Sequence, residues 1–292
     1  MKKLSGFLLG LSLVFGTVSL ASAQERSEVV HVPPTVLVIS REFVKPGKSG
    51  AVHDRSESAF VRAMASAKSP TTYLGLNSVS GKPRALFLVG YDSFAAWEKD
   101  QQDTAKNPTL SAALDRAAEA DGQLLDSYDQ SAWIYRPDQS LNQTGDLVGV
   151  RYFEIESFRL KPGHEADWEA AVKLVKDAYS KAMPDAHWAM CENVFGLGSP
   201  AYLVITPRKS ASEIDAGFQQ GPKFMAAMGT DGMKKLGELS AAAIESTETN
   251  LFTINPRQSY MTGYLVKADP DFWRPKSAPA AAPKKDEPEA KP

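Results

Sequence analysis

Cysteine is almost missing from this 292-residue sequence: Cys191 is the single one, so no disulfide can form within the chain. Histidine is scarce as well, with four residues, and the Cys/His spacings of zinc sites do not occur. Glycine-rich phosphate loops and a Ser-His-Asp order are also lacking. We therefore expect ordinary hydrophobic cores to stabilise the fold, and we predict neither a metal site nor a bound cofactor.

A basic surplus is lacking too. The chain has 33 Lys and Arg against 35 Asp and Glu, a formal net charge of −2. Proteins that bind nucleic acid carry a surplus of basic side chains that displaces counterions from the phosphates. The balance of charges therefore argues against a nucleic-acid partner.

A long hydrophobic run occurs at the N-terminus. Lys2 and Lys3 precede an apolar stretch over 7–20, and the small residues of 21–23 form a cleavage site. This pattern is typical of a secretory signal peptide over 1–23, with an uncleaved anchor as the alternative. We expect an exported protein, periplasmic or secreted, with no transmembrane segment after cleavage. Cleavage would leave 269 residues and change the formal net charge from −2 to −4.

The remaining chain repeats itself. Lys45-Pro46-Gly47 recurs 116 positions later as Lys161-Pro162-Gly163, and Trp133–Ser140 aligns with Phe252–Ser259. An offset this long that drifts by a few residues indicates a duplicated domain with loop insertions. We divide the chain into a signal peptide (1–23), a lead segment (24–34), a first unit (35–140), a second unit (147–258), a C-terminal extension (259–273) and an Ala/Pro/Lys/Glu tail (274–292) expected to be disordered.

Each unit alternates strand and helix signals in the same order. In the first unit we predict strands over 36–43, 71–79, 84–91 and 131–135, and helices over 48–68, 94–99 and 108–125. The second unit repeats this order. A βαββαβ order builds an α+β, ferredoxin-like layer whose antiparallel sheet has helices on one face. The other face of each sheet must also be buried, so we predict that the two units pack as one pseudo-dimeric α/β barrel.

This order, with a strand that runs into Lys161-Pro162-Gly163 and a helix that carries Trp168, resembles the dimeric α/β-barrel superfamily. That superfamily includes antibiotic-biosynthesis monooxygenases, NIPSNAP and EthD-like domains, and the haem-binding chlorite dismutases and dye-decolourising peroxidases. The resemblance implies the fold and a barrel pocket rather than a reaction. Because the barrel is duplicated within one chain, we expect a monomer with an internal pseudo-dimer, or a homo-oligomer of such chains.

Strand alternation predicts which side chains line that pocket. Phe153 and Ile155 are expected to face the helices, which turns Glu154 and Glu156 toward the barrel interior. If Trp188 and Met190 also take the helix side, further polar residues share the inner face. The predicted pocket residues are Tyr73, Asn77, Glu154, Glu156, His187, Cys191 and Asn193. Buried charges are costly unless they are paired, so this set suggests a small polar or aromatic ligand; locally satisfied or solvated side chains are the alternative.

Two further chemistries remain as alternatives. His53 and Glu57 have the i, i+4 spacing of one helix face, but two ligands do not make a metal site and we interpret them as a surface pair. His187 is the residue we would place as a haem axial ligand.

Three classes of function follow in order: a protein that binds a small molecule in the barrel, a cofactor-independent monooxygenase-like or haem-dependent enzyme, and a structural or interaction module. Whether the protein is an enzyme stays open. An apolar barrel interior that excludes Glu154, Glu156 and His187 would remove the site expected for the first two.

Overall fold

The computed structural model describes residues 32–143, 145–198 and 200–274. The expected signal peptide, most of the lead segment and the tail beyond residue 274 lie outside these ranges. Within them, no helix has both the length and the hydrophobicity that a bilayer crossing requires.

The first half of the barrel alternates strands and helices as the sequence predicts. Its elements are β1 (Val36–Val44), α1 (Ala51–Ala67), β2 (Tyr73–Ser78), β3 (Arg84–Tyr91), α2 (Phe94–Ala105), α3 (Pro108–Gly122) and β4 (Leu125–Tyr135). The last strand is longer than the sequence pattern indicated, because its N-terminal residues are exposed and lack the apolar alternation used to predict it.

The second half repeats the order and adds two short helices. Its elements are β5 (Tyr152–Leu160), α4 (Glu165–Ala182), β6 (Ala189–Phe195), β7 (Ala201–Arg208), α5 (Ser212–Gln219), α6 (Gly221–Ala243), β8 (Ile244–Ile254), α7 (Tyr264–Ala268) and α8 (Pro270–Trp273). The repeated Lys-Pro-Gly turn ends β1 and β5 alike. Its glycines, Gly47 and Gly163, have φ of 76° and 85°, the left-handed region that glycine enters without steric cost.

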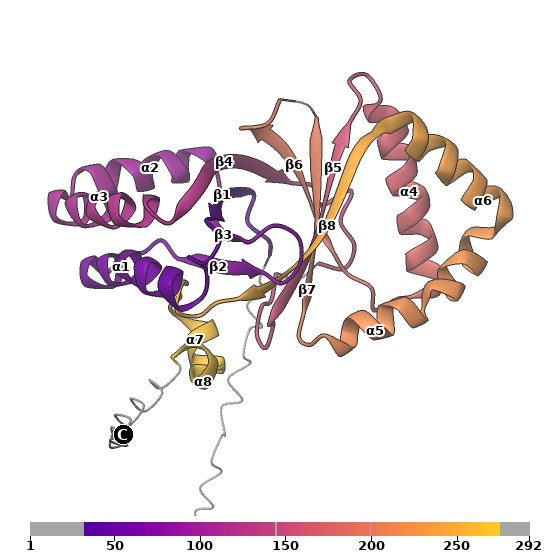
Figure 1. Ribbon diagram of the computed structural model, residues 1–292. Helices are drawn as coiled ribbons and strands as arrows, with labels where there is room; N and C mark the ends of the chain where they lie inside the picture. The colour runs from indigo at the N-terminus through magenta and orange to yellow at the C-terminus, as the bar shows by residue number, and fades with distance from the viewer. Residues whose placement is uncertain (1–31, 144, 199, 275–292) are drawn as a thin grey trace, which may run out of the picture. The chain divides into compact units, whose positions relative to one another are not determined.

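The strands close into one antiparallel barrel in the order β1-β3-β2-β8-β5-β7-β6-β4. Each half contributes four neighbouring strands in the ferredoxin-like order, and the two halves join where β2 pairs with β8 and β4 pairs with β6. Helices α1–α3 lie on one side of the barrel and α4–α6 on the other (Figure 1). The predicted pseudo-dimeric α/β barrel is therefore confirmed.

The barrel interior is a packed apolar core. All eight strands contribute alternate buried side chains to one cluster, which only the inside of a closed barrel can bring together. Its members on the strands include Leu37, Ile39, Leu74, Leu76, Leu86, Leu88, Trp133, Phe153, Ile155, Cys191, Ala201, Leu203, Ile205, Phe252 and Ile254. Leu265, Val266 and Trp273 of α7 and α8 join the same cluster, so the extension packs on this core through two short helices.

The predicted orientation of the first strands is therefore wrong. Phe153 and Ile155 point into the barrel, and Glu154 and Glu156 point outward to the helices of the second half. Polar and apolar residues do alternate as predicted, but in a closed barrel covered by helices both faces are enclosed. Alternation alone does not identify the inner face.

Candidate functional site

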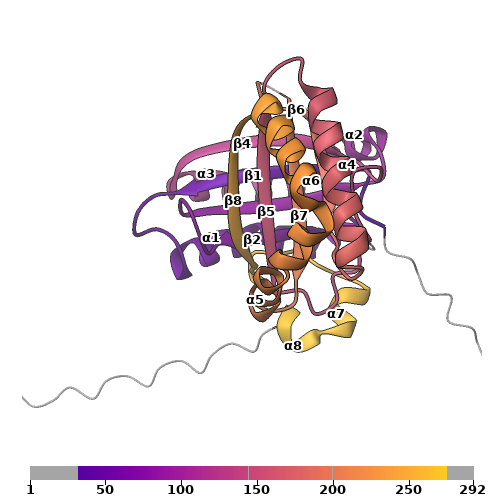
Figure 2. The same ribbon diagram turned by 90° about the vertical axis from the view of Figure 1, so that its right-hand side faces the viewer.

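The helices of the second half leave a space over their part of the barrel. Helix α4 packs on the sheet through Trp168 and Val172, whereas α6 packs mainly along α4 (Figure 2). Helix α6 is also broken at Gly229, where φ is 67° and ψ is 171°. Between β5, β6, β7 and these helices lies a cavity of about 710 Å³.

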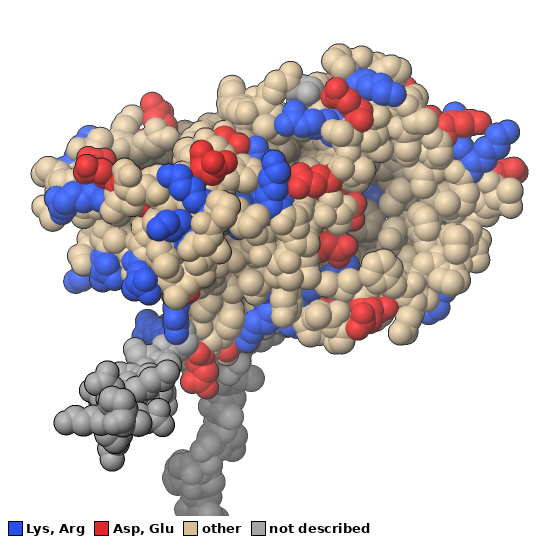
Figure 3. Space-filling model, in the orientation of Figure 1, with Lys and Arg blue, Asp and Glu red and all other residues tan. Residues whose placement is uncertain are grey.

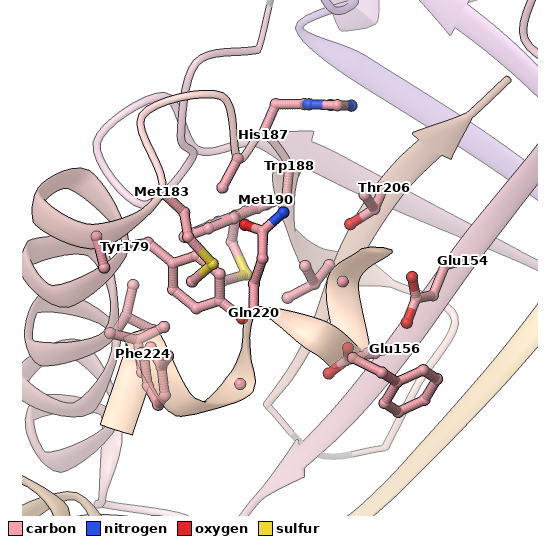
Figure 4. Close-up of a pocket in the computed structure, with 18 of the residues that line it drawn as sticks. Glu154, Glu156, Tyr179, Met183, His187, Trp188, Met190, Thr206, Gln220 and Phe224 are labelled. Atoms are coloured by element: carbon pink, nitrogen blue, oxygen red, sulfur yellow. The ribbon is translucent and has the colours of Figure 1, made fainter. Parts of the chain in front are cut away.

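Aromatic and sulfur-containing side chains form much of the cavity wall. The Tyr179 ring on α4 lies edge-on to Trp188, with 5.2 Å between centroids, and 5.0 Å from the Phe224 ring on α6. Met183 and Met190 lie beside them (Figure 4). Phe218 on α5, 81% exposed, also lines the cavity. These walls fit an apolar or aromatic ligand body.

Two carboxylates project from β5 into this cavity. Glu154 and Glu156 share one face of the strand (Figure 4), and Arg208 on β7 donates to Glu154 with a distance of 2.9 Å from Nη2 to Oε2. Among the residues that the structure describes, no side chain donates a hydrogen bond to Glu156. Figure 3 shows the surface hollowed between the barrel and the helices of the second half, with acidic side chains beside the hollow.

The electrostatics of the site follow from this arrangement. Burial raises the pKa of Glu156 above its ordinary value of 4.5, the charge of Glu154 raises it further, and Arg208 opposes both effects. Burial and the charge of Glu156 also raise the pKa of the Tyr179 hydroxyl. The carboxyl groups that line the cavity number four (Glu154, Glu156, Asp185 and Glu213), against two cations (Arg208 and Lys223). The cavity therefore has an excess of negative charge.

His187 lines the same cavity but presents neither ring nitrogen to it. Nδ1 lies 3.1 Å from the carbonyl oxygen of Asp185, and Nε2 lies 3.2 Å from that of Pro207. In Figure 4 the ring lies apart from the carboxylates of Glu154 and Glu156. This placement gives no support to His187 as an axial ligand, which would need a free lone pair.

The structure separates the other predicted pocket residues from these three. Cys191 is 4% exposed in the barrel core. Asn193 donates through Nδ2 to the carbonyl oxygens of Ala132 and Phe195 at the β4–β6 junction. Tyr73 lies on the helix side of the first half, and Asn77 sits opposite Ala85 in the β2–β3 ladder. The predicted common inner face is therefore wrong for this set.

A slip of one residue explains the misplacement of Tyr73. In the first half Leu74 pairs with Leu88, and in the second half Ala189 pairs with Ile205, the counterpart of Leu88. Leu74 therefore corresponds to Ala189, an offset of 115 between the second strands of the two halves. The sequence alignment used 116. Because side chains alternate along a strand, one residue of slip reverses the face.

Sequence reasoning missed two features. Arg208, the last residue of β7, continues the outward face of Val204 and Thr206, and it was not among the predicted pocket residues. The His53–Glu57 pair was interpreted as a surface pair, yet the two residues are 2% and 3% exposed and lie with Glu42 and Asp121. Helical spacing does not tell a buried face from an exposed one unless its residues are apolar.

The fold is that of a pseudo-dimeric α/β barrel, built from two ferredoxin-like halves of one chain. No family model matches the sequence, and no curated protein matches it. One similar solved structure is an anthrone oxidase-like protein, 12% identical with a TM-score of 0.48, over 75% of this chain and 91% of that one. Another is a mutant chlorite dismutase from Candidatus Nitrospira defluvii, 10% identical with a TM-score of 0.44, over 79% and 96%. Likeness at this level assigns neither an activity nor a cofactor to this chain.

Proposed function

We propose that this protein binds a small amphipathic molecule carrying a positive charge, such as a primary amine with an aromatic or aliphatic body, in the cavity between β5–β7 and α4–α6. The observation that carries the proposal is Glu156, a carboxylate in an apolar cavity that receives no side-chain hydrogen bond from the residues the structure describes. Burial disfavours the charged form of this half-buried carboxylate, and a ligand that donates to it offsets part of that cost.

The charge balance favours a cation over an anion. Arg208 is bonded to Glu154 and offsets the charge of Glu156 only in part, so Glu156 is the carboxylate on β5 that has no cation bonded to it among the described residues. An ammonium group here would gain a charge-assisted hydrogen bond, and the aromatic side chains of Tyr179, Trp188 and Phe224 would contact the ligand body. A carboxylate ligand would meet repulsion from both glutamates.

This site differs from the one expected from the sequence. The barrel interior is apolar, and Glu154, Glu156 and His187 lie outside it, so the small-molecule function moves to the outer face of the sheet. Export of the protein, predicted from residues 1–23, would place such binding in the periplasm or outside the cell.

The test is calorimetry with amines of increasing size, namely benzylamine, tryptamine and dodecylamine, each against the alcohol with the same carbon skeleton. We expect the amines to bind more tightly than the alcohols, and Glu156→Gln to weaken amine binding about tenfold while leaving the alcohols unchanged. Glu238→Gln, at an exposed position on α6, is the matched control. Equal binding of amines and alcohols, or no binding of any of them, would overturn the proposal.

A further inference from the structure

The first half of the barrel encloses a second cluster of titratable side chains. Its four members are Glu42 on β1, His53 and Glu57 one turn apart on α1, and Asp121 on α3. Their exposed fractions are 7%, 2%, 3% and 1%. Three elements therefore direct one imidazole and three carboxyl groups to the same buried point between the sheet and the helices.

 The geometry of the four groups matches that of a metal site. His53 Nε2 lies 3.1 Å from Glu42 Oε2, 3.5 Å from Asp121 Oδ1 and 3.8 Å from Glu57 Oε1. One ligand atom from each residue lies within 4.8 Å of all the others. Ligands bound tetrahedrally at ~2.1 Å are ~3.4 Å apart, a value that these separations bracket.

Unpartnered oxygens are an independent indication of a ligand. Glu57 Oε1 and both carboxylate oxygens of Asp121 are buried and lack a hydrogen-bond partner among the residues described. Among the described residues, His53 is the one cationic group that contacts these carboxylates. One imidazole cannot satisfy three buried carboxylates, and unpaired buried charges are costly.

The duplicated half shows that the fold itself does not require polar groups here. The bulges at Phe43/Val44 and Arg159/Leu160 align β1 with β5, so Phe158 takes the place of Glu42. Phe158 packs against Trp168 and Val172, an i, i+4 pair on α4 as His53 and Glu57 are on α1. The same layer is thus apolar in one half and a His/carboxylate cluster in the other.

We propose that Glu42, His53, Glu57 and Asp121 bind one first-row divalent transition-metal cation, such as Mn²⁺, Fe²⁺ or Zn²⁺. One imidazole nitrogen with three carboxylate oxygens suits these ions better than Mg²⁺ or Ca²⁺, which take oxygen ligands, or Cu⁺, which takes sulfur. A divalent cation offsets two of the three carboxylate charges. Four protein ligands in a buried site are typical of a structural ion, here one that ties α1 and α3 to β1.

Gln258 supplies a partner outside the ligand set. Its side chain is fully buried, with Nε2 3.3 Å from His53 Nδ1, and its Oε1 has no partner among the described residues. Metal binding through Nε2 places the imidazole proton on Nδ1, which then needs an acceptor. Reorientation of the Gln258 amide would present Oε1 as that acceptor, in exchange for the hydrogen bond that Nε2 donates to Asp54 Oδ1 at 2.9 Å.

The test uses the full-length mature chain, stripped with a chelator and titrated separately with Mn²⁺, Zn²⁺ and Mg²⁺. Native mass spectrometry measures stoichiometry and calorimetry measures affinity. We expect one Mn²⁺ or Zn²⁺ per chain, a higher melting temperature with the ion, and no comparable effect of Mg²⁺. Glu57→Gln and Asp121→Asn keep the side-chain shape and should each weaken binding by about tenfold or more. Glu98→Gln/Glu238→Gln, two exposed acidic residues outside the cluster, is the matched control.

A second readout separates a ligand role from a purely structural one. Glu57→Gln removes one ligand oxygen and keeps the side-chain shape, so it should reduce the rise in melting temperature caused by the ion while leaving the metal-free protein folded. Absence of stoichiometric Mn²⁺ or Zn²⁺ binding would overturn the proposal and leave a proton-sharing cluster. Binding that both single variants leave unchanged, or that the control pair abolishes, would overturn it as well.

Discussion

Arg208 on β7 directs two N–H groups to one oxygen of Glu154 on β5, with 2.9 Å from Nη2 and 3.3 Å from Nε to Oε2. Both side chains are about one-quarter exposed. The guanidinium is therefore bonded to one of the two glutamates, and Glu156 remains in the cavity with its charge only partly offset by Arg208.

Arg208→Gln should make the cavity more selective for cations. The change removes the charge that opposes Glu154 and Glu156, so we expect tryptamine to bind several-fold more tightly. Stability should fall by about 1 kcal/mol or less, because a partly exposed ion pair contributes little. Calorimetry and urea denaturation measure the two effects, and weaker tryptamine binding would contradict this account of the charges.

Glu156 should make the protein less stable as the pH rises. Its folded pKa is raised above the ordinary value of 4.5, so its contribution to stability is present below pH 4.5 and is lost as the pH rises through the folded pKa. The free energy of unfolding of Glu156→Gln should therefore increase relative to that of the native protein between pH 4 and pH 8. Urea denaturation at several pH values measures this difference.

Glu238→Gln on α6 is the control for this pH dependence, because residue 238 is exposed. A difference that stays constant with pH, or one that shrinks as the pH rises, would show that the environment of Glu156 does not disfavour its charged form.

The sequence predicted the barrel and its element order because the repeat, the turn residues and the hydrophobic periodicity are local signals. It did not predict which face of each strand points into the barrel. In β5, Phe153 and Glu154 lie on opposite faces as the alternation predicts, but the alternation is the same whichever of the two faces points inward. It also missed the cluster around His53, whose members Glu42 and Asp121 come from distant segments. Long-range assembly of polar residues leaves no periodic signal in a single sequence.

Cys191 should be unreactive in the folded protein. Burial raises the pKa of its thiol to about 12, and the side chain is 4% exposed within the barrel core. Since the thiolate is the reactive form, we expect iodoacetamide to modify Cys191 at pH 8 only as fast as the protein unfolds. Mass spectrometry over a urea series measures the rate. Rapid modification of the native protein would show that the barrel core admits solvent.

Phe153 and Glu154 provide a matched pair for testing the two faces of β5. Phe153 is 4% exposed in the barrel core, so Phe153→Ala should reduce the free energy of unfolding by about 3–5 kcal/mol. Glu154 lies outside the barrel, paired with Arg208, and Glu154→Ala should change stability by about 1 kcal/mol or less. Equal costs from urea denaturation would contradict the assignment of faces.

Gly75 should tolerate no side chain, because the segment after β8 crosses its α-carbon. A Cβ at this position would lie 2.5 Å from the carbonyl oxygen of Gln258, and the backbone N–H of Gly75 donates to Ser259 Oγ at 2.9 Å. Gly75→Ala must push this segment away, and we expect it to cost roughly 1–3 kcal/mol of stability.

The shift would also move Gln258 relative to His53, so Gly75→Ala should weaken Mn²⁺ or Zn²⁺ binding without altering a ligand. Gly237→Ala on α6 is the control: an added Cβ meets no atom within 4 Å there, and alanine in a helix should be neutral or stabilising by roughly 0.5–1 kcal/mol. Urea denaturation of both variants measures the stabilities and calorimetry measures the ion affinities. If Gly75→Ala is as stable as Gly237→Ala, the segment around Gln258 is not held against β2. The inference that this segment positions His53 would then be wrong.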